Sequence, residues 1–237
     1  MSIKAVLFDL DGTLLPMDQD VFIGAYMKNL AAKLGPQGYD PEKLVGSIWK
    51  GTGAMIANDG SCSNEDAFWR VFCTIFGENA RDDEPLFDEF YRTDFGKVQQ
   101  VCGFDEGAAK VIDLVKEKGL RTALATNPIF PAIATQSRIR WAGLQPEDFE
   151  FYTTYENCRY CKPNLDYYRD VIGKMGLQPE ECLMVGNDVG EDMIARKLGC
   201  DVFLLTDCLI NKVDGNIDDY PHGGFAELLD YIGRIGL

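Results

Sequence analysis

Carboxylate side chains follow two apolar runs that lie far apart in the sequence. Asp9 and Asp11 come after the apolar residues 3–8, and Asp188 comes after the apolar residues 182–185. Carboxylates that gather at one place repel one another, which is costly unless a cation lies among them. Such hard oxygen ligands favour Mg²⁺. A carboxylate can also attack phosphorus, while a second carboxylate gives a proton to the leaving group.

Other polar residues follow apolar runs in the same way. Thr126 and Asn127 end the stretch LATN, and Lys162 stands in CKP. Asn187 and Asp192 lie in VGNDVGED, beside Asp188. A hydroxyl, a lysine and backbone N–H groups at a helix N-terminus can together hold phosphoryl oxygens. The residue types therefore suit phosphoryl transfer, provided that the fold brings them together.

The pattern of apolar residues predicts an α/β fold that would do so. Nearly continuous apolar runs, typical of buried parallel strands, occupy residues 3–8, 122–125, 182–185 and 202–205, with a weaker one at 149–154. Amphipathic stretches with helix-ending glycines occupy residues 107–119, 131–143, 164–176 and 190–199. This alternation predicts a doubly wound parallel sheet covered by helices. Ligands bind beyond the carboxyl ends of strands in such sheets, where the polar clusters stand.

The segment after the first strand breaks the alternation. It is rich in aromatic residues and shows helical periodicity, as in residues 21–35 and 65–77. We expect residues 16–96 to form a helical cap domain, and residues 1–15 with 97–237 to form the core. The alternative is that these helices pack on the core itself. Candidate hinges are residues 14–18 and the neighbourhood of Gly96.

Composition limits the kinds of partner. The 237 residues carry 38 acidic and 23 basic side chains, a net charge of −15. Such a surface repels nucleic acid and anionic membranes, so we expect neither as a partner. The start of the sequence does not have the pattern of a signal peptide, and no apolar stretch approaches a membrane span. We expect a cytoplasmic protein whose eight cysteines are reduced.

Four motifs now carry a resemblance to a known family. FDLDGTLL, LATN, CKP and VGNDVGED, in this order and at suitable spacing, resemble the signature motifs of the haloacid dehalogenase (HAD) superfamily. The resemblance covers residues 3–14 and roughly 100–205. The insert lies where subfamily I members carry a helical C1-type cap. The resemblance implies a Rossmann-like core, a Mg²⁺ cofactor and a site assembled from the four motifs.

The resemblance also implies roles for the acidic residues. Asp9 would be the nucleophile that becomes phosphorylated and a Mg²⁺ ligand. Asp11 would be the general acid and then the base, and its backbone carbonyl would bind the metal. Asp188 would ligate Mg²⁺, and Asp192 would orient a metal-bound water or the motif's lysine. Many members have Gly-Asp where this chain has Gly-Asn187, so Asn187 is a supporting residue with a direct or water-mediated metal contact left open.

Substrate contacts are implied for four residues. Thr126 would hydrogen-bond the phosphoryl group, helped by backbone N–H groups near Asn127. Lys162 would neutralise charge on the nucleophile and on the phosphoryl oxygens. From the insert, Lys50 in WKGTGAM could reach the substrate, although we favour its interpretation as a surface lysine at a helix end.

An acid at Asp11 bears on the chemistry. An alkoxide leaving group needs a proton, whereas a halide does not, so Asp11 favours phosphate ester chemistry over dehalogenation. We expect a Mg²⁺-dependent phosphatase that acts on a small phosphorylated metabolite. Two alternatives stay open: a phosphotransferase or mutase of the β-phosphoglucomutase type, and a regulatory or binding protein with this fold. The substrate's carbon skeleton and the oligomeric state stay open as well.

Cys158 and Cys161 form a CxxC pair directly before Lys162. One pair supplies two of the four ligands of a structural zinc site, there is no second CxxC, and His222 is the chain's one histidine. We therefore interpret the cysteines as packing or surface thiols. A lysine nearby could still lower a thiol pKa and make the enzyme sensitive to oxidation, which we state as a hypothesis.

Overall fold

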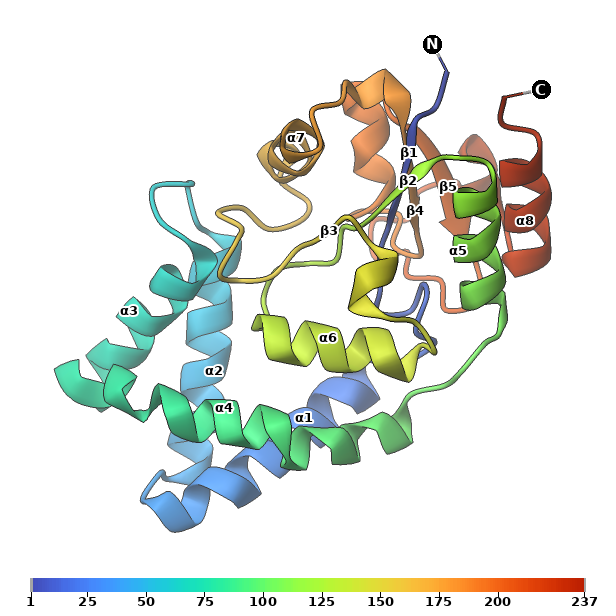
Figure 1. Ribbon diagram of the computed structural model, residues 1–237. Helices are drawn as coiled ribbons and strands as arrows, with labels where there is room; N and C mark the ends of the chain where they lie inside the picture. Colours follow the sequence, from blue (N-terminus) through green and yellow to red (C-terminus); the bar gives the residue numbers. More distant parts are fainter. Residues whose placement is uncertain (1, 237) are drawn as a thin grey trace.

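The computed structural model describes residues 2–236 and contains one parallel sheet (Figure 1). Its strands run in the order β3-β2-β1-β4-β5-β6. The strands are β1 (Ala5–Phe8), β2 (Arg121–Leu124), β3 (Phe151–Tyr152), β4 (Cys182–Gly186), β5 (Asp201–Leu205) and β6 (His222–Gly223). The order in which strands are added to the sheet changes side at β1, because β2 pairs with one edge of β1 and β4 with the other. The carboxyl ends of β1 and β4 therefore border the crevice where such sheets bind ligands.

Side chains alternate between two apolar layers. In β1, Val6 and Phe8 join one cluster, while Ala5 and Leu7 join the other, and all four are buried. Both faces of the sheet are thus covered, which explains why the strands read as continuous apolar runs. The five predicted strands are confirmed. β6 was not predicted, because two residues carry no periodic signal.

Helices cover both faces of this sheet. One face packs against α5 (Gly107–Glu117), α6 (Ala132–Trp141) and α8 (Phe225–Gly233), and the other against α7 (Leu165–Lys174) and the 3₁₀ helix η6 (Met193–Leu198). The prediction of one continuous helix over 190–199 is wrong. Backbone N–H groups at Gly190 and Glu191 bond the Asp188 side chain, so these residues form a turn before a short 3₁₀ helix.

The segment after β1 is helical, as predicted. It contains α1 (Gln19–Leu34), α2 (Pro41–Ile56), α3 (Asn64–Phe76) and α4 (Glu84–Arg92), with 3₁₀ helices η1 (Gly35–Gln37), η2 (Glu78–Asp83) and η3 (Asp94–Val101). Side chains cap three of the helices: Asp18 at α1, Asp40 at α2 and Ser63 at α3. Within residues 2–236, none of the helices combines the length and apolarity that a membrane crossing needs.

Two chain segments that lie side by side connect the insert to the core. Met17 pairs with Cys102 in an antiparallel bridge, and the Gly103 N–H donates to the Pro16 carbonyl at 2.7 Å. Helical structure continues through η3 to Val101, so the expected boundary at residue 96 falls inside a helix. Gly96, the expected hinge neighbourhood, lies within η3. The paired segments at 16–17 and 102–103 are the connection.

The insert packs directly on the core through aromatic residues. Phe22 and Tyr26 of α1 contact Phe130, with ring centroids 6.2 and 5.3 Å apart. Phe95 of η3 contacts Trp141 of α6 at 5.0 Å. Figure 1 shows α6 between the helices of the insert and the sheet. One apolar cluster therefore runs from the core into the insert.

Candidate active site

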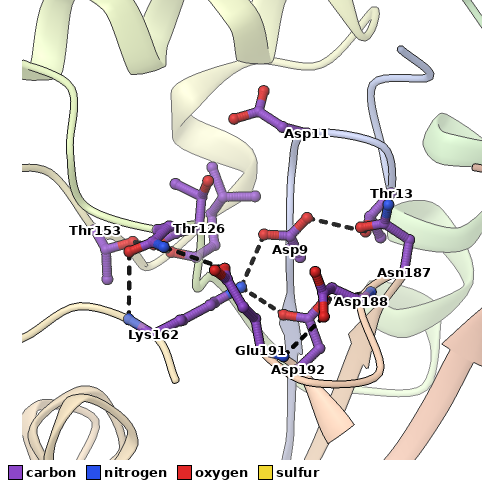
Figure 2. A network of polar contacts seen from close by, with 12 residues as sticks. Asp9, Asp11, Thr13, Thr126, Thr153, Lys162, Asn187, Asp188, Glu191 and Asp192 are labelled. Carbon is purple, nitrogen blue, oxygen red and sulfur yellow. Dashed lines mark hydrogen bonds and ion pairs between the residues drawn. The ribbon is translucent and has the colours of Figure 1, made fainter. Parts of the chain in front are cut away.

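Asp9 lies at the centre of a polar network at the end of β1 (Figure 2). Its backbone N–H continues the sheet by donating to the Val185 carbonyl at 2.9 Å. The residue as a whole is only 7% exposed. Lys162 Nζ lies 2.8 Å from Asp9 Oδ1, and Thr13 Oγ1 lies 3.0 Å from Asp9 Oδ2. These contacts fix the orientation of a carboxylate that faces the crevice.

Lys162 joins two carboxylates. Besides Asp9, it contacts Asp192 Oδ1 at 2.6 Å, and its side chain is almost fully buried. Burial alone would lower the pKa of Lys162, but Asp192 and Asp9 raise it well above its ordinary value. The lysine is therefore charged across the physiological pH range. Its backbone N–H donates to Asn127 Oδ1 at 3.3 Å, which ties two of the predicted motifs together.

Asp192 supports the lysine from below. Its Oδ2 accepts the Asp188 N–H at 3.0 Å, and burial raises the pKa of the Asp192 carboxyl. Gly186 makes room for it, because a Cβ at that position would lie 2.2 Å from the Asp192 carboxyl carbon. Of the two predicted contacts of Asp192, a metal-bound water or Lys162, the structure contains the one with Lys162.

Asn187, which follows β4, forms hydrogen bonds to the segments that contain Thr13 and Cys208. Its Oδ1 lies 3.0 Å from Thr13 Oγ1, and its Nδ2 donates to the Cys208 carbonyl at 2.6 Å. Gly12, at φ +85°, packs against it, and a Cβ there would lie 2.3 Å from Asn187 Nδ2. Both polar atoms of the amide thus have protein partners. These protein contacts account for Asn187 without a metal contact.

Asp188 follows β4 and is the residue next to Asn187. Its Oδ1 accepts the N–H groups of Gly190 and Glu191 at 2.7 and 2.9 Å. Its Oδ2 takes no part in these two bonds. Asp9 and Asp188 extend from neighbouring strands, since β1 pairs with β4.

Asp11 is oriented differently from Asp9. Figure 2 shows its carboxylate pointing away from the Lys162–Asp192 pair. It forms an ion pair with Arg138 of α6, and its Oδ1 is buried with no hydrogen-bond partner among the described residues. Burial raises the pKa of Asp11, and Arg138 offsets part of that increase. A raised pKa suits a group that must hold a proton before it donates one.

Arg138 was not predicted as a site residue. Its side chain is fully buried, and its guanidinium carbon lies 4.4 Å from the centroid of the Phe130 ring. Its Nη2 also donates to Thr135 Oγ1 at 3.3 Å. The sequence contained a signal, because Arg138 is in phase with the buried residues Ala134 and Ala142 at a spacing of four. A charged residue on the apolar side of a helix requires a buried partner.

The remaining predicted substrate contacts differ in their placement. Thr126 is buried, and its carbonyl accepts bonds from Thr153 Oγ1 at 2.6 Å and from the Tyr167 hydroxyl at 2.8 Å. Asn127 donates to Glu191 Oε2 at 3.1 Å, so Glu191 is a further site residue that was not predicted. Lys50 is exposed on α2 and is not among the residues that line the cavity over the site.

The CxxC loop holds the insert in place. The Asn64 N–H donates to the Cys158 carbonyl at 2.9 Å, and Asn64 Nδ2 donates to the Pro128 carbonyl and to Cys161 Sγ at 3.2 and 3.3 Å. Both thiols are free and buried, as the packing interpretation predicts. The hypothesis of a lowered thiol pKa is wrong. Burial raises the pKa of Cys158 to about 12, and it raises the pKa of Cys161 further.

The donor set fits a small divalent cation. Among residues 2–236, no group of three His, Cys, Asp or Glu side chains is arranged so that it could hold a metal ion. The two buried cations of the site, Lys162 and Arg138, are nevertheless outnumbered by carboxylates. The carboxylates are Asp9, Asp11, Asp188, Glu191 and Asp192. This excess negative charge favours a bound cation, and Mg²⁺ commonly takes only one or two carboxylates and fills its other positions with water and phosphate.

Comparison with known proteins identifies the family. The family model of haloacid dehalogenase-like hydrolases matches residues 3–199. The chain is 28% identical over 200 residues to the glyceraldehyde 3-phosphate phosphatase of Methanothermobacter thermautotrophicus, covering 81% of this chain and 80% of that protein. It is 26% identical over 232 residues to the phosphoglycolate phosphatase of Vibrio vulnificus, covering 97% and 96%.

The fold agrees with these matches. A HAD phosphatase from Thermococcus onnurineus superposes with a TM-score of 0.60 at 18% sequence identity, covering 99% of this chain and all of that one. The resemblance seen in the four motifs is thereby confirmed. The chain belongs to the haloacid dehalogenase-like hydrolase family.

Proposed function

We propose that this protein is a Mg²⁺-dependent phosphatase that hydrolyses a small phosphorylated metabolite through an aspartyl phosphate on Asp9. The observation that carries the proposal is the environment of Asp9. Its carboxylate is held by Lys162 and Thr13 at the mouth of the crevice, and Asp11 follows two residues later beside the cavity. A nucleophile and a proton donor thus flank one place where a phosphoryl group can lie.

In the first step, a carboxylate oxygen of Asp9 attacks phosphorus as the ester P–O bond breaks. The leaving alkoxide takes a proton from Asp11, and burial raises the pKa of that carboxyl above its ordinary value. Lys162 offsets negative charge that gathers on the phosphoryl oxygens, and Thr126 lies at the end of the neighbouring strand to bind them. An alcohol leaves, and an acyl phosphate remains on Asp9.

In the second step, water attacks the phosphorus of the acyl phosphate. Asp11, now ionised, takes a proton from that water, and the P–O bond to Asp9 breaks. Inorganic phosphate and the original carboxylate result. Arg138 stabilises the ionised form of Asp11 between the two steps, because its guanidinium forms the buried ion pair with that carboxylate.

Asp9, Asp188 and the Asp11 backbone carbonyl would hold the metal. When bound, Mg²⁺ offsets charge on the phosphoryl oxygens and on the carboxylates around it. A binding measurement tests the assignment without turnover. Calorimetric titration should detect Mg²⁺ binding to the wild type and weaker binding to Asp188→Asn, while Asp218→Asn, an exposed control, should leave it unchanged.

Phosphate release tests the proposal as a whole. We expect Mg²⁺-dependent release from at least one member of a panel of phosphate monoesters, with loss in chelator and in Asp9→Asn. The Asn side chain keeps the shape but is no longer an anionic nucleophile. Equal release by the wild type and Asp9→Asn would exclude Asp9 as the nucleophile. No release of phosphate from any ester would favour a binding role.

A further inference from the structure

A cavity of about 400 Å³ lies between the insert and the core, next to the catalytic residues. Asp11 and Asn127 lie at its catalytic end. The other walls come from α1, α2, α3 and α4 and from the segment after β2. A volume of this size is ordinary for the binding site of a small molecule. Asp11, the proposed proton donor to the leaving group, lines this cavity. The alcohol part of the substrate, which leaves as the ester bond breaks, must therefore lie there.

Aromatic and aliphatic side chains form most of the cavity wall. The aromatic residues that line it come from both the insert and the core; they are Phe22, Tyr26, Trp49, Phe68, Trp69, Phe87, Tyr91, Phe130 and Tyr155. Two of the tyrosines satisfy one another, since the hydroxyls of Tyr26 and Tyr91 lie 2.9 Å apart. Gln19, Thr52, Asn127 and Tyr155 also line the cavity, so polar partners for the hydroxyls of a sugar phosphate are a minority of this wall.

Charge in the cavity disfavours a second anionic group. Its charged lining residues are Asp11, Asp20, Glu191 and Lys212. Asp20 and Lys212 are exposed, so they belong to the outer part, and burial raises the pKa of Glu191. Arg138 is committed to Asp11. The insert itself contributes no cation to the described lining. A carboxylate on the substrate, remote from its phosphate, would therefore have no cationic partner there.

Resting on the phosphatase function proposed above, we propose that the substrate is a phosphate monoester of an uncharged, largely apolar alcohol, aromatic or branched aliphatic. The phosphoryl group lies at Asp9 and the organic part fills the cavity. Apolar area removed from water drives the recognition of that part. Phosphoglycolate, the substrate in the names of several relatives, has a carboxylate in place of this apolar part and is disfavoured. The mostly apolar wall also disfavours sugar phosphates, and therefore the alternative function as a sugar phosphate mutase.

Two pairs of probes separate the chemical classes. Benzyl phosphate and phosphoglycolate are both esters of primary alcohols, so their comparison bears on the organic part. We expect kcat/KM to be at least about tenfold higher for benzyl phosphate. Benzylphosphonate and phosphonoacetate cannot be hydrolysed and report binding alone. In the presence of Mg²⁺, calorimetry should find benzylphosphonate at least about tenfold tighter.

A charge placed in the cavity supplies the matched variant. Ile23 lines the cavity and is half-buried, whereas Val21 on the same helix is 51% exposed and does not line it. Ile23→Lys should reduce kcat/KM for benzyl phosphate and raise it for phosphoglycolate. Val21→Lys should leave both within about twofold of the wild type, because it adds the same charge outside the cavity.

The outcomes distinguish the two proposals. A preference for phosphoglycolate over benzyl phosphate in phosphate release would overturn the substrate class while supporting the phosphatase. If no ester releases phosphate, the phosphatase proposal fails, and the phosphonates still decide the cavity. Tighter binding of benzylphosphonate would then support apolar recognition, and equal or weaker binding would overturn it.

Discussion

The buried pair between Arg138 and Asp11 gives the strongest prediction about stability. Arg138→Met keeps most of the side-chain volume but removes the charge, the bond to Thr135 and the contact with the Phe130 ring. Removing one partner of a buried ion pair costs about 3–5 kcal/mol of unfolding free energy. In a chain of this size, each kcal/mol shifts the melting temperature by about 2–4 °C. We expect Tm to fall by about 6–20 °C.

Arg140→Met is the matched control. Arg140 lies on the same helix two residues away, but its side chain is exposed and it takes part in none of the described ion pairs. A surface substitution of this kind changes stability by about 0.5 kcal/mol or less. Both variants lose one positive charge, so their difference isolates burial. Calorimetric melts of the two variants and the wild type, in chelator, measure it.

The pH dependence of the deficit tests its cause. Burial raises the folded-state pKa of Asp11, and Arg138 opposes that increase, so the pKa rises further in Arg138→Met. The neutral carboxyl is then favoured by folding. That contribution is full below the unfolded pKa and is lost as pH rises through the folded pKa. The Tm deficit should therefore grow from acidic to neutral pH. Equal melting of the Arg138 and Arg140 variants, or a deficit that does not change with pH, would refute the buried-pair reasoning.

Three further predictions concern the same network. Lys162→Met should abolish measurable phosphate release and lower Tm, because two buried carboxylates lose their cation; a melt near wild type would contradict the coupling. Asn187→Asp introduces the residue that is commoner at this place of the motif. It should lower the free energy of unfolding by about 1–3 kcal/mol, because the Nδ2 donor to the Cys208 carbonyl is lost. Urea titration measures this change, and unchanged stability would argue against a structural role for the Asn187 amide. Cys158 and Cys161 should resist iodoacetamide in the folded protein at pH 8, because thiolate forms only as pH approaches the raised pKa; rapid labelling of either in a mass-spectrometric assay would contradict their burial.

Much of this fold was predictable from the sequence. Buried strands such as β1 and β4 read as continuous apolar runs because both faces of the sheet are covered. Parallel strands end at one edge, so the placement of Asp9, Lys162 and Asp188 near one another followed from topology and motif order. The length of the insert was predictable only approximately, since helical periodicity continues through η3 to Val101.

The features that sequence reasoning missed depend on tertiary contacts. Arg138 and Arg140 look alike in a single sequence unless the phase of α6 is known. The role of Asn64 depends on a loop almost a hundred residues away, at Cys161. The turn at Gly190 replaces a helix because the Asp188 side chain binds the backbone there. The Asn64 contact and the turn at Gly190 leave no local pattern strong enough to predict them, so both needed the three-dimensional structure.

The most direct test of the central claim is to trap the aspartyl phosphate. The enzyme would be mixed with benzyl phosphate and Mg²⁺, quenched in acid during turnover, digested and analysed by mass spectrometry. We predict a phosphoryl adduct on the peptide that contains Asp9, and its absence from Asp9→Asn. Steady phosphate release without an adduct on that peptide, together with retained activity in Asp9→Asn, would contradict the account.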